Sequence, residues 1–375
     1  MQGADADVVR AALESGEPLP GAGGFAGEID GALVRDVLGR YPLFVERDTP
    51  ASEPLPADAW SHDPGDLETP DPFPAGHVRD DAGTRRAWTL PDPDPYADRE
   101  TAVEAVRTAV EGSVDAVDAE DLAIAFSGGV DSALLAARLD APLYVAGFPE
   151  SHDVEAARSA AAALDCDLTV VELTHDALER AVPELVAATG RTDAMAIQIA
   201  LPLYLTAERV AADGFDRLAV GQGADELFGG YAKVAKAPED PRVEADTVRG
   251  AQREVVATLP AQLERDVLAL RAAGVEPVAP LLHDDVVGAA LRLDDRMLVD
   301  GETRKWALRQ AALGSLPEAV ATRDKKAAQY GSLAARELDR LARQAGYKRR
   351  MDDHVTQYVE SLTPSTRPFR RRRSP

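Results

Sequence analysis

The chain has 375 residues, of which 45% are hydrophobic, and 65 acidic against 41 basic residues give it a formal net charge of −24. This length predicts one large domain with a smaller one. Such an acidic chain repels nucleic acid and anionic membranes, which excludes both as general partners. No apolar run approaches the roughly 20 residues of a membrane helix, and the start MQGADADVV lacks the basic and apolar parts of a signal peptide. We therefore expect a cytoplasmic protein, and homo-oligomer formation stays open.

Three regions of different composition follow one another along the chain. Short alternating stretches in GGFAGEIDGALVRDVLGRYPLFVERD predict a small β-rich segment, and the stretch from Thr49 to about Pro95 is rich in Pro, Asp and Gly. Prolines at this density exclude long helices and central strands. We place the β-rich segment and its Pro-rich linker at 1–95, the main domain at 96–362 and a basic tail at 363–375.

The main domain begins with a helix and then alternates strands and helices. Apolar spacing predicts helices at 98–117, 133–139 and 153–164, and strands at 121–126, 143–148 and 167–173. This alternation predicts an α/β fold built on a Rossmann-like, doubly wound parallel sheet. Beyond residue 231 the pattern is mostly helical, to about Val359.

The first chemical motif is SGGVDS, which follows an apolar strand and opens a helix. Gly128 and Gly129 let the backbone approach a ligand closely, and the free N–H groups of a helix start attract an anion. Ser127 and Ser132 add hydroxyl donors, and Asp131 can hold a Mg²⁺ ion that bridges phosphates. A capped strand–turn–helix without a ligand is the alternative. The motif is not a Walker loop, because no Lys follows its glycines.

SGGVDS resembles the pyrophosphate loop, SGGxDS, of the ATP-pyrophosphatase families. These include asparagine, GMP, NAD and argininosuccinate synthetases and tRNA-thiolating enzymes. The resemblance implies a fold of the adenine nucleotide alpha hydrolase type, ATP and Mg²⁺ as cofactors, and adenylylation of an acceptor with release of pyrophosphate. It does not choose the acceptor.

A second motif narrows the family. VGQGADELFGGY at 220–231 resembles the asparagine synthetase signature, a strand followed by G-E-G-x-D-E-[LV]-F-G-G-Y. A Gly-rich strand exit before an ordinary helix is the alternative. The resemblance implies that Asp225 shares the metal with Asp131 and that Asp225 and Glu226 belong to the catalytic set. It also implies that adenine and ribose contact Phe126, Ala146, Gly147, Val220 and Gly221.

A third stretch agrees with this family. GETRKWALRQ at 301–310, followed by LPEAVATRDKKAAQYGS, resembles the family's K-x-x-L-R … L-P … R-x-K-x-x-x-x-G-S region. The resemblance implies that Lys305 neutralises charge as pyrophosphate departs, and that Arg323 and Lys325 lie on a helix that closes over the phosphates. Solvated cations near helix ends are the alternative for each.

The N-terminal segment resembles the closing strands of a glutamine amidotransferase domain of the same family. A complete domain of that type is longer than the segment before Pro95, and it begins with a cysteine nucleophile. Here position 2 is Gln2, and the single cysteine, Cys166, lies in the main domain. We therefore expect no glutaminase activity from this chain alone, and free ammonia or a separate glutaminase would supply nitrogen.

Four positions depart from the family pattern. One is His283, which stands where the family has Asp and which we expect to be a surface or capping residue and not a site residue. Gln222 stands where asparagine synthetases have Glu, and an amide cannot act as a base. Gln198 and Val278 stand where relatives have Arg, the residue that holds a carboxylate in bidentate fashion. These losses weaken the case for aspartate and leave three hypotheses. They are an asparagine synthetase-like enzyme, an AMP-forming ligase for another carboxylate or for an intramolecular amide, and a non-catalytic ATP-binding partner.

The first hypothesis predicts that aspartate, ATP and ammonia give asparagine, AMP and pyrophosphate through an acyl-adenylate. The composition adds an expectation about origin. Only six of the 41 basic residues are Lys, while Asp and Glu are in large excess. Concentrated salt screens charges over a few ångströms and so reduces the self-repulsion of such a chain. We therefore expect a halophilic archaeal protein.

Overall fold

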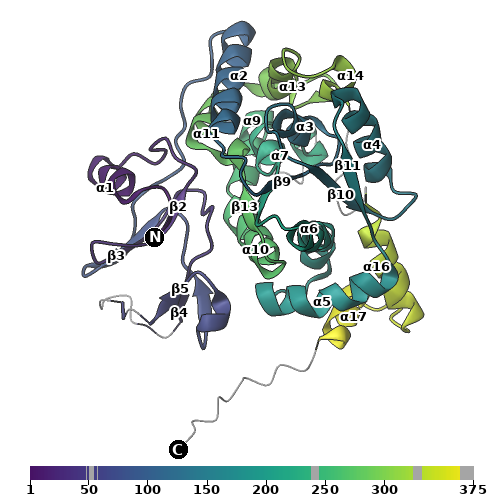
Figure 1. The fold of residues 1–375 in the computed structure, drawn as a ribbon. Helices are drawn as coiled ribbons and strands as arrows, with labels where there is room; N and C mark the ends of the chain where they lie inside the picture. Colours follow the sequence, from purple (N-terminus) through teal and green to yellow (C-terminus); the bar gives the residue numbers. More distant parts are fainter. Residues whose placement is uncertain (48, 50–54, 57, 238–244, 324–331, 364–375) are drawn as a thin grey trace, which may run out of the picture.

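The chain is described by a computed structural model, in which a small N-terminal region lies beside a larger α/β body (Figure 1). Within its described ranges, none of the helices combines the length and apolarity needed to span a bilayer. The described residues are 1–47, 49, 55–56, 58–237, 245–323 and 332–363.

In its described residues, the N-terminal region contains two small sheets, one α-helix and one short 3-10 helix, as its predicted short strands suggested. The larger sheet has the order β1-β2-β3-β7-β8 and the smaller the order β5-β4-β6. The elements are β1 (Gln2–Gly3), α1 (Ala6–Ser15), β2 (Phe25–Ile29), β3 (Ala32–Arg35), β4 (Phe44–Glu46), β5 (Trp60–Ser61), η1 (Pro64–Asp66), β6 (Pro70–Pro72), β7 (His77–Asp80) and β8 (Gly83–Arg86).

The expectation that residues 49–95 contain no central strand is wrong. Strand β7 pairs with β3 on one side and β8 on the other, antiparallel to both. Its sequence, His-Val-Arg-Asp, has no proline, so every residue keeps the N–H that a two-sided ladder requires. The prolines flank this strand instead of interrupting it.

A five-stranded parallel sheet forms the centre of the larger body, and this confirms the predicted α/β organisation. Its order is β11-β10-β9-β12-β13, and every neighbouring pair is parallel. The chain runs from β9 outward to β11, then returns to the other side of β9 and continues to β13. The strands are β9 (Leu122–Ala125), β10 (Leu143–Gly147), β11 (Leu168–Glu172), β12 (Arg217–Ala219) and β13 (Glu276–Val278).

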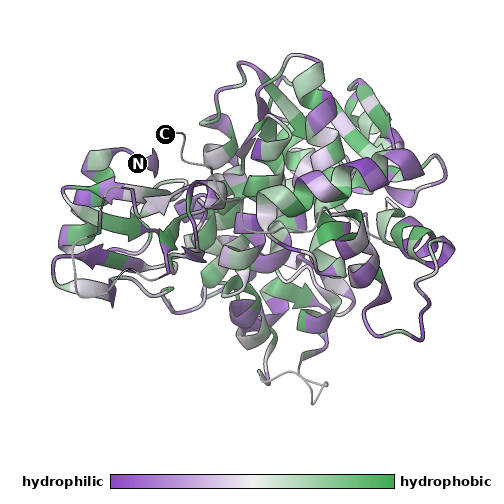
Figure 2. Cartoon of the chain, turned by 90° about the horizontal axis from the view of Figure 1, so that it is seen from below, coloured by the Kyte–Doolittle hydropathy of each residue, from purple (hydrophilic) through white to green (hydrophobic). Residues whose placement is uncertain are grey.

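Helices cover both faces of this sheet, because its central strands are apolar on both sides. On β9, Leu122 and Ile124 pack into a core with α3 (Val130–Ala136) and α4 (His152–Leu164). Ala123 points to the other face, towards α6 (Ala194–Ala212) and α10 (Leu259–Ala272). Figure 2 shows the same distribution, with hydrophobic residues concentrated where elements pack and hydrophilic residues on the outer faces.

Most of the remaining described elements are helices, as predicted for the C-terminal part. They are α2 (Arg99–Asp115), α5 (His175–Thr189), α7 (Ala224–Leu227), α8 (Ala232–Ala235), α9 (Val248–Val256), η3 (Pro280–Leu282), α11 (Asp284–Leu291), α12 (Asp295–Leu298), β14 (Val299–Asp300), β15 (Thr303–Arg304), α13 (Trp306–Ala312), α14 (Glu318–Ala321), α16 (Ala334–Gln344) and α17 (His354–Leu362). Strand β13 was not predicted, because the middle one of its three residues is Pro277. A sheet tolerates proline in an edge strand, and β13 is one.

A buried ion-pair network joins the N-terminal region to the larger body. The Arg40 guanidinium donates to Asp36 Oδ1 at 3.0 Å and to Asp284 Oδ1 at 2.5 Å. It also donates to the carbonyls of Leu282 and Ala22, both at 3.0 Å. Ion pairs this deeply buried hold two segments in a defined relation, because each charge loses its compensation if they separate.

Candidate active site

A cavity of about 300 Å³ opens at the carboxyl ends of β9, β10 and β12. The chain leaves β9 in one direction and β12 in the other, and a crevice forms in an α/β sheet where adjacent connections diverge. Nine of the predicted site residues line the cavity: Phe126, Ser127, Asp131, Ser132, Ala146, Val220, Gly221, Asp225 and Glu226. Two predicted motifs, far apart in the chain, thus meet at one place.

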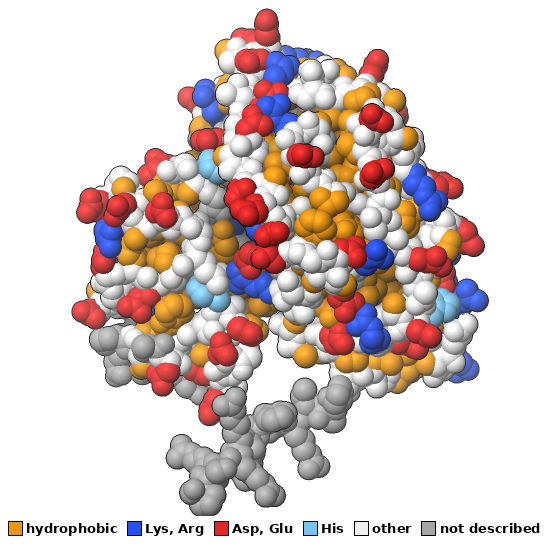
Figure 3. All heavy atoms as spheres, viewed as in Figure 1, with side chains coloured by type: hydrophobic (Ala, Val, Ile, Leu, Met, Phe, Trp, Pro, Cys, Tyr) orange, Lys and Arg blue, Asp and Glu red, His pale blue; other side chains and the backbone are white. Residues whose placement is uncertain are grey.

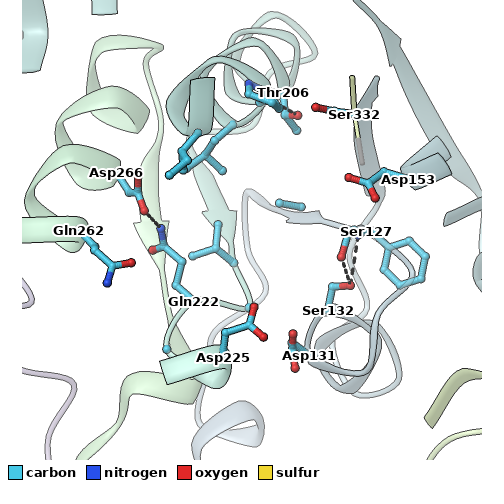
Figure 4. A pocket seen from close by; sticks show the side chains of 18 of the residues that line it. Ser127, Asp131, Ser132, Asp153, Thr206, Gln222, Asp225, Gln262, Asp266 and Ser332 are labelled. Carbon is cyan, nitrogen blue, oxygen red and sulfur yellow. Dashed lines mark hydrogen bonds between the residues drawn. The ribbon is translucent and has the colours of Figure 1, made fainter. Parts of the chain in front are cut away.

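The SGGVDS loop is held in one tight shape. Gly128 has φ +72°, and a Cβ on it would lie 2.5 Å from the carbonyl oxygen of Ala156, so only glycine fits there. The Ser127 amide donates to Ser132 Oγ at 3.2 Å, and the two hydroxyls lie 3.3 Å apart (Figure 4). Gly129 caps helix α3, which begins at the next residue.

Lys305 lies between two carboxylates at the base of this site. Its Nζ is 2.8 and 2.7 Å from the two carboxylate oxygens of Asp131 and 2.7 Å from Asp225 Oδ1. Burial by itself lowers the pKa of Lys305, but the attraction and hydrogen bonds of both carboxylates outweigh it, so the pKa is raised above its ordinary value. The ammonium group is therefore charged.

The two carboxylates also fit a Mg²⁺ ion. Oxygens of Asp131 and Asp225 each lie 2.7 Å from one cationic nitrogen, so they converge closely enough to share a cation. In the described part of the chain, no group of three or more His, Cys, Asp or Glu side chains forms a metal site by itself. This suits Mg²⁺, which commonly takes one or two carboxylates and completes its shell with water and phosphate oxygens.

Glu226 is a buried acid on the wall of the cavity. Its Oε1 accepts a hydrogen bond from Tyr231 Oη at 2.5 Å. Burial, the largest contribution, and the nearby Asp225 raise the pKa of Glu226, although the Tyr231 hydrogen bond opposes them. Burial and the Glu226 charge raise the pKa of Tyr231 as well. A carboxyl with a raised pKa in a cleft is suited to accepting a proton.

Gln222, which also lines the cavity, contacts two residues that lie outside the predicted motifs. Gln222 Nε2 donates to Asp266 Oδ2 at 2.7 Å, and Arg265 Nε donates to Asp266 Oδ1 at 2.6 Å. Both Arg265 and Asp266 line the cavity. A signal for them exists in the sequence, since Glu264, Arg265 and Asp266 form a charged run inside the otherwise apolar part of α10.

Several predicted residues lie elsewhere. Gly147 is outside the described cavity lining, and so are Gln198 and Val278. Arg323 donates to the Ala156 carbonyl at 2.6 Å and to Ser159 Oγ at 2.8 Å, and so binds α4 behind the loop. Lys325 lies outside the described residues.

Comparison with known protein families identifies the family to which this chain belongs. The family model described as asparagine synthase matches residues 104–254 and 235–363, which together exceed half of the chain. The chain belongs to the asparagine synthase family. This membership accounts for the contacts that Lys305 makes with an Asp of SGGVDS and an Asp of the signature at 220–231.

Two relatives illustrate the extent of the match. A protein of Methanocaldococcus jannaschii, named provisionally as a glutamine-hydrolysing asparagine synthetase, is 30% identical over 279 residues, 65% of this chain and 51% of its own length. The glutamine-hydrolysing asparagine synthetase B of Escherichia coli is 28% identical over 362 residues, 86% of this chain and 64% of its own. The matched part is thus half to two thirds of these members of the asparagine synthase family.

Proposed function

We propose that this chain is an AMP-forming amide synthetase with the ATP-pyrophosphatase fold, which converts aspartate and ammonia to asparagine. A carboxylate oxygen of aspartate attacks the α-phosphorus of ATP, and the bond to the departing pyrophosphate breaks. Ammonia then attacks the acyl carbon of the adenylate, loses a proton, and AMP leaves. The observation that carries this proposal is the convergence of Asp131, Asp225 and Lys305 beside the SGGVDS loop.

Each of these residues has a defined role in the proposed reaction. Asp131 and Asp225 would hold Mg²⁺, which would neutralise phosphate charge when bound. Lys305 stabilises the negative charge that develops on pyrophosphate. Glu226, with its raised pKa, accepts the proton that ammonia loses, a role that the neutral Gln222 cannot perform.

The nitrogen reaches the site as free ammonia or from a separate glutaminase. Cys166, the single cysteine of the 375 residues, follows α4 in the larger body, and its Sγ donates to the Leu164 carbonyl at 3.4 Å. Burial and two neighbouring carboxylates raise the pKa of this thiol, which disfavours the nucleophilic thiolate. We propose that Cys166 takes no part in glutamine hydrolysis.

A high-salt cytoplasm is the proposed setting of this reaction. On the face shown in Figure 3, acidic side chains are spread over both the N-terminal region and the larger body, interspersed with basic ones. Concentrated salt screens the repulsion among them. Activity is therefore best measured in concentrated KCl.

The direct test follows nucleotides by chromatography in concentrated KCl with Mg²⁺, ATP, aspartate and ammonium. We expect AMP, pyrophosphate and asparagine in equal amounts, and only when aspartate is present. AMP formation with another carboxylate but not with aspartate would mean that the acceptor is a different carboxylate. That result would agree with the presence of Gln198 and Val278 in place of arginines. ATP binding without turnover of any carboxylate would contradict a catalytic role.

Replacing Asp131 with Asn separates an enzyme from a silent ATP-binding subunit. We expect AMP formation to fall by at least about 100-fold, since the variant loses a metal ligand and the partner of Lys305. The matched control is Asp140→Asn. Asp140 is exposed and lies shortly after α3, the helix that contains Asp131, so this change should leave turnover unchanged. Equal turnover in both variants would remove Asp131 from the catalytic site.

Gly230→Ala tests the geometry of the Asp225–Lys305 pair. A Cβ on Gly230 would overlap Asp225 Oδ1 and lie 2.5 Å from Lys305 Cε, so both groups must shift. Because misplacement of about 1 Å can cost about 100-fold in rate, we expect a decrease of that order in AMP formation. Gly288→Ala is the control, since nothing lies within 4 Å of its Cβ position. Unchanged turnover in Gly230→Ala would show that the reaction does not depend on this pair.

A further inference from the structure

One cationic side chain on the cavity wall has unused hydrogen-bonding capacity. Arg265 is only 6% exposed, and it is the only basic residue among the described residues that line the cavity. Asp266 accepts from its Nε at 2.6 Å. In the described part of the chain, no side chain or carbonyl accepts from its two terminal nitrogens. Those nitrogens remain for a ligand.

Two side chains, Gln222 and Asp266, set the orientation of this guanidinium through consecutive hydrogen bonds. We call this pair the relay. Gln222 Nε2 donates to one oxygen of Asp266 at 2.7 Å, and Arg265 Nε donates to the other at 2.6 Å. A carboxylate at position 222 would place a second negative charge against Asp266. The amide of Gln222 is therefore what this arrangement requires, which gives a structural reason for its departure from the family's Glu.

The relay occupies the side of the cavity away from the nucleotide loop. Figure 4 shows Gln222 and Asp266 on one wall, Ser127 and Ser132 on the opposite wall, and Asp225 and Asp131 between them. Lys305 is engaged by Asp131 and Asp225. A negatively charged acceptor thus meets Arg265 on its side of the cavity and the reacting phosphate at the middle.

We propose that Arg265 binds the non-reacting carboxylate of the acceptor, with Gln222 and Asp266 as positioning residues. The acceptor is then a dicarboxylate, because one carboxylate must reach the α-phosphorus while the other is held. A planar guanidinium with two free nitrogens matches a carboxylate in bidentate geometry. This inference rests on the proposed function. In it, Arg265 of α10 provides the positive charge that Gln198 and Val278 cannot provide.

The first experiment compares acceptors in the Arg265→Met variant. We expect kcat/KM for aspartate to fall about 100-fold, as for loss of hydrogen bonds to a charged group. Turnover of 3-aminopropanoate, which lacks the second carboxylate, should change less than about twofold, and so should the KM for ATP. An equal fall with both acceptors would overturn the proposal, because the variant would then only have damaged the site.

The second experiment restores the family's residue with Gln222→Glu. We expect kcat/KM for aspartate to fall, because the new carboxylate repels Asp266 and releases Arg265. Adding Asp266→Asn to the same chain should recover at least part of the loss, since an amide and a carboxylate then face each other again. Higher turnover in Gln222→Glu alone would overturn the relay and assign position 222 to proton transfer.

A binding measurement separates failure of this subsite from failure of the proposed function. Calorimetry with succinate, in the presence of Mg²⁺ and an ATP analogue that cannot be cleaved at the α-phosphorus, needs no turnover. Succinate binding by the wild type that Arg265→Met weakens at least 10-fold supports the subsite even if no acceptor is adenylylated. No succinate binding by a wild type that binds the nucleotide analogue would overturn it.

Discussion

Replacing Lys305 with Met should lower AMP formation by about 1000-fold, the upper range for loss of one preorganised group that stabilises transition-state charge. Lys305 is 6% exposed and contacts both carboxylates of the site, so no water molecule or neighbouring cation can replace it without rearrangement. Single-turnover chromatography of nucleotides in concentrated KCl measures this directly. Lys348→Met, at an exposed position, is the control and should retain full activity.

Folding of the Lys305 variant must be established independently, since its removal leaves Asp131 and Asp225 without their shared cation. Circular dichroism and calorimetric binding of the nucleotide analogue serve this purpose. A folded variant that binds nucleotide and loses turnover supports the catalytic role. A folded variant that keeps wild-type turnover would show that Lys305 only neutralises the two carboxylates.

Replacing Arg40 with Met should lower the free energy of unfolding by about 3–5 kcal/mol, the effect of removing one partner of a buried ion pair. Its side chain is 4% exposed, while those of Asp36 and Asp284 are 1% and 2% exposed. Two carboxylates would remain buried without their cation, together with the carbonyls that Arg40 now satisfies. Urea unfolding in concentrated KCl gives the difference from the wild type.

The control for Arg40 lies in the same N-terminal region. Arg10 pairs with Asp7 and Asp30 on the surface, with its side chain 44% exposed, and exposed pairs contribute little. We expect Arg10→Met to unfold at the wild-type urea concentration. Equal behaviour of the two variants would mean that the buried network does not hold the N-terminal region to the larger body.

The Arg40 network also reaches the active site. Arg40 binds the Leu282 carbonyl, and the Leu282 side chain fills the space where a Cβ on Gly223 would lie. Gly223 directly follows Gln222 and has φ +88°. The N-terminal region therefore supports the turn that carries the relay to Arg265, which gives it a structural role independent of glutamine hydrolysis.

Local patterns were sufficient for the features that depend on neighbours in the chain. The apolar run before SGGVDS, the glycines at 128 and 129, and the spacing of 98–117 predicted β9, the loop and α2. We expect His283 to be a surface or capping residue in preference to a site residue, and its Nδ1 accepts from the Asp285 amide at 3.3 Å at the start of α11. Alternation, helix periodicity and turn chemistry are short-range properties, so a single sequence reports them.

Contacts between distant segments were decided by the packing of the sheet. Lys305 and Asp131 are 174 positions apart, and Gln222 and Asp266 are 44 apart, yet both pairs meet where the strand order reverses. Arg265 is one of several charged residues in α10, and β13 lies in a stretch that the pattern predicts to be mostly helical. Their roles depend on which elements pack side by side, and that is set by burial of apolar faces across the whole chain, which no local pattern records.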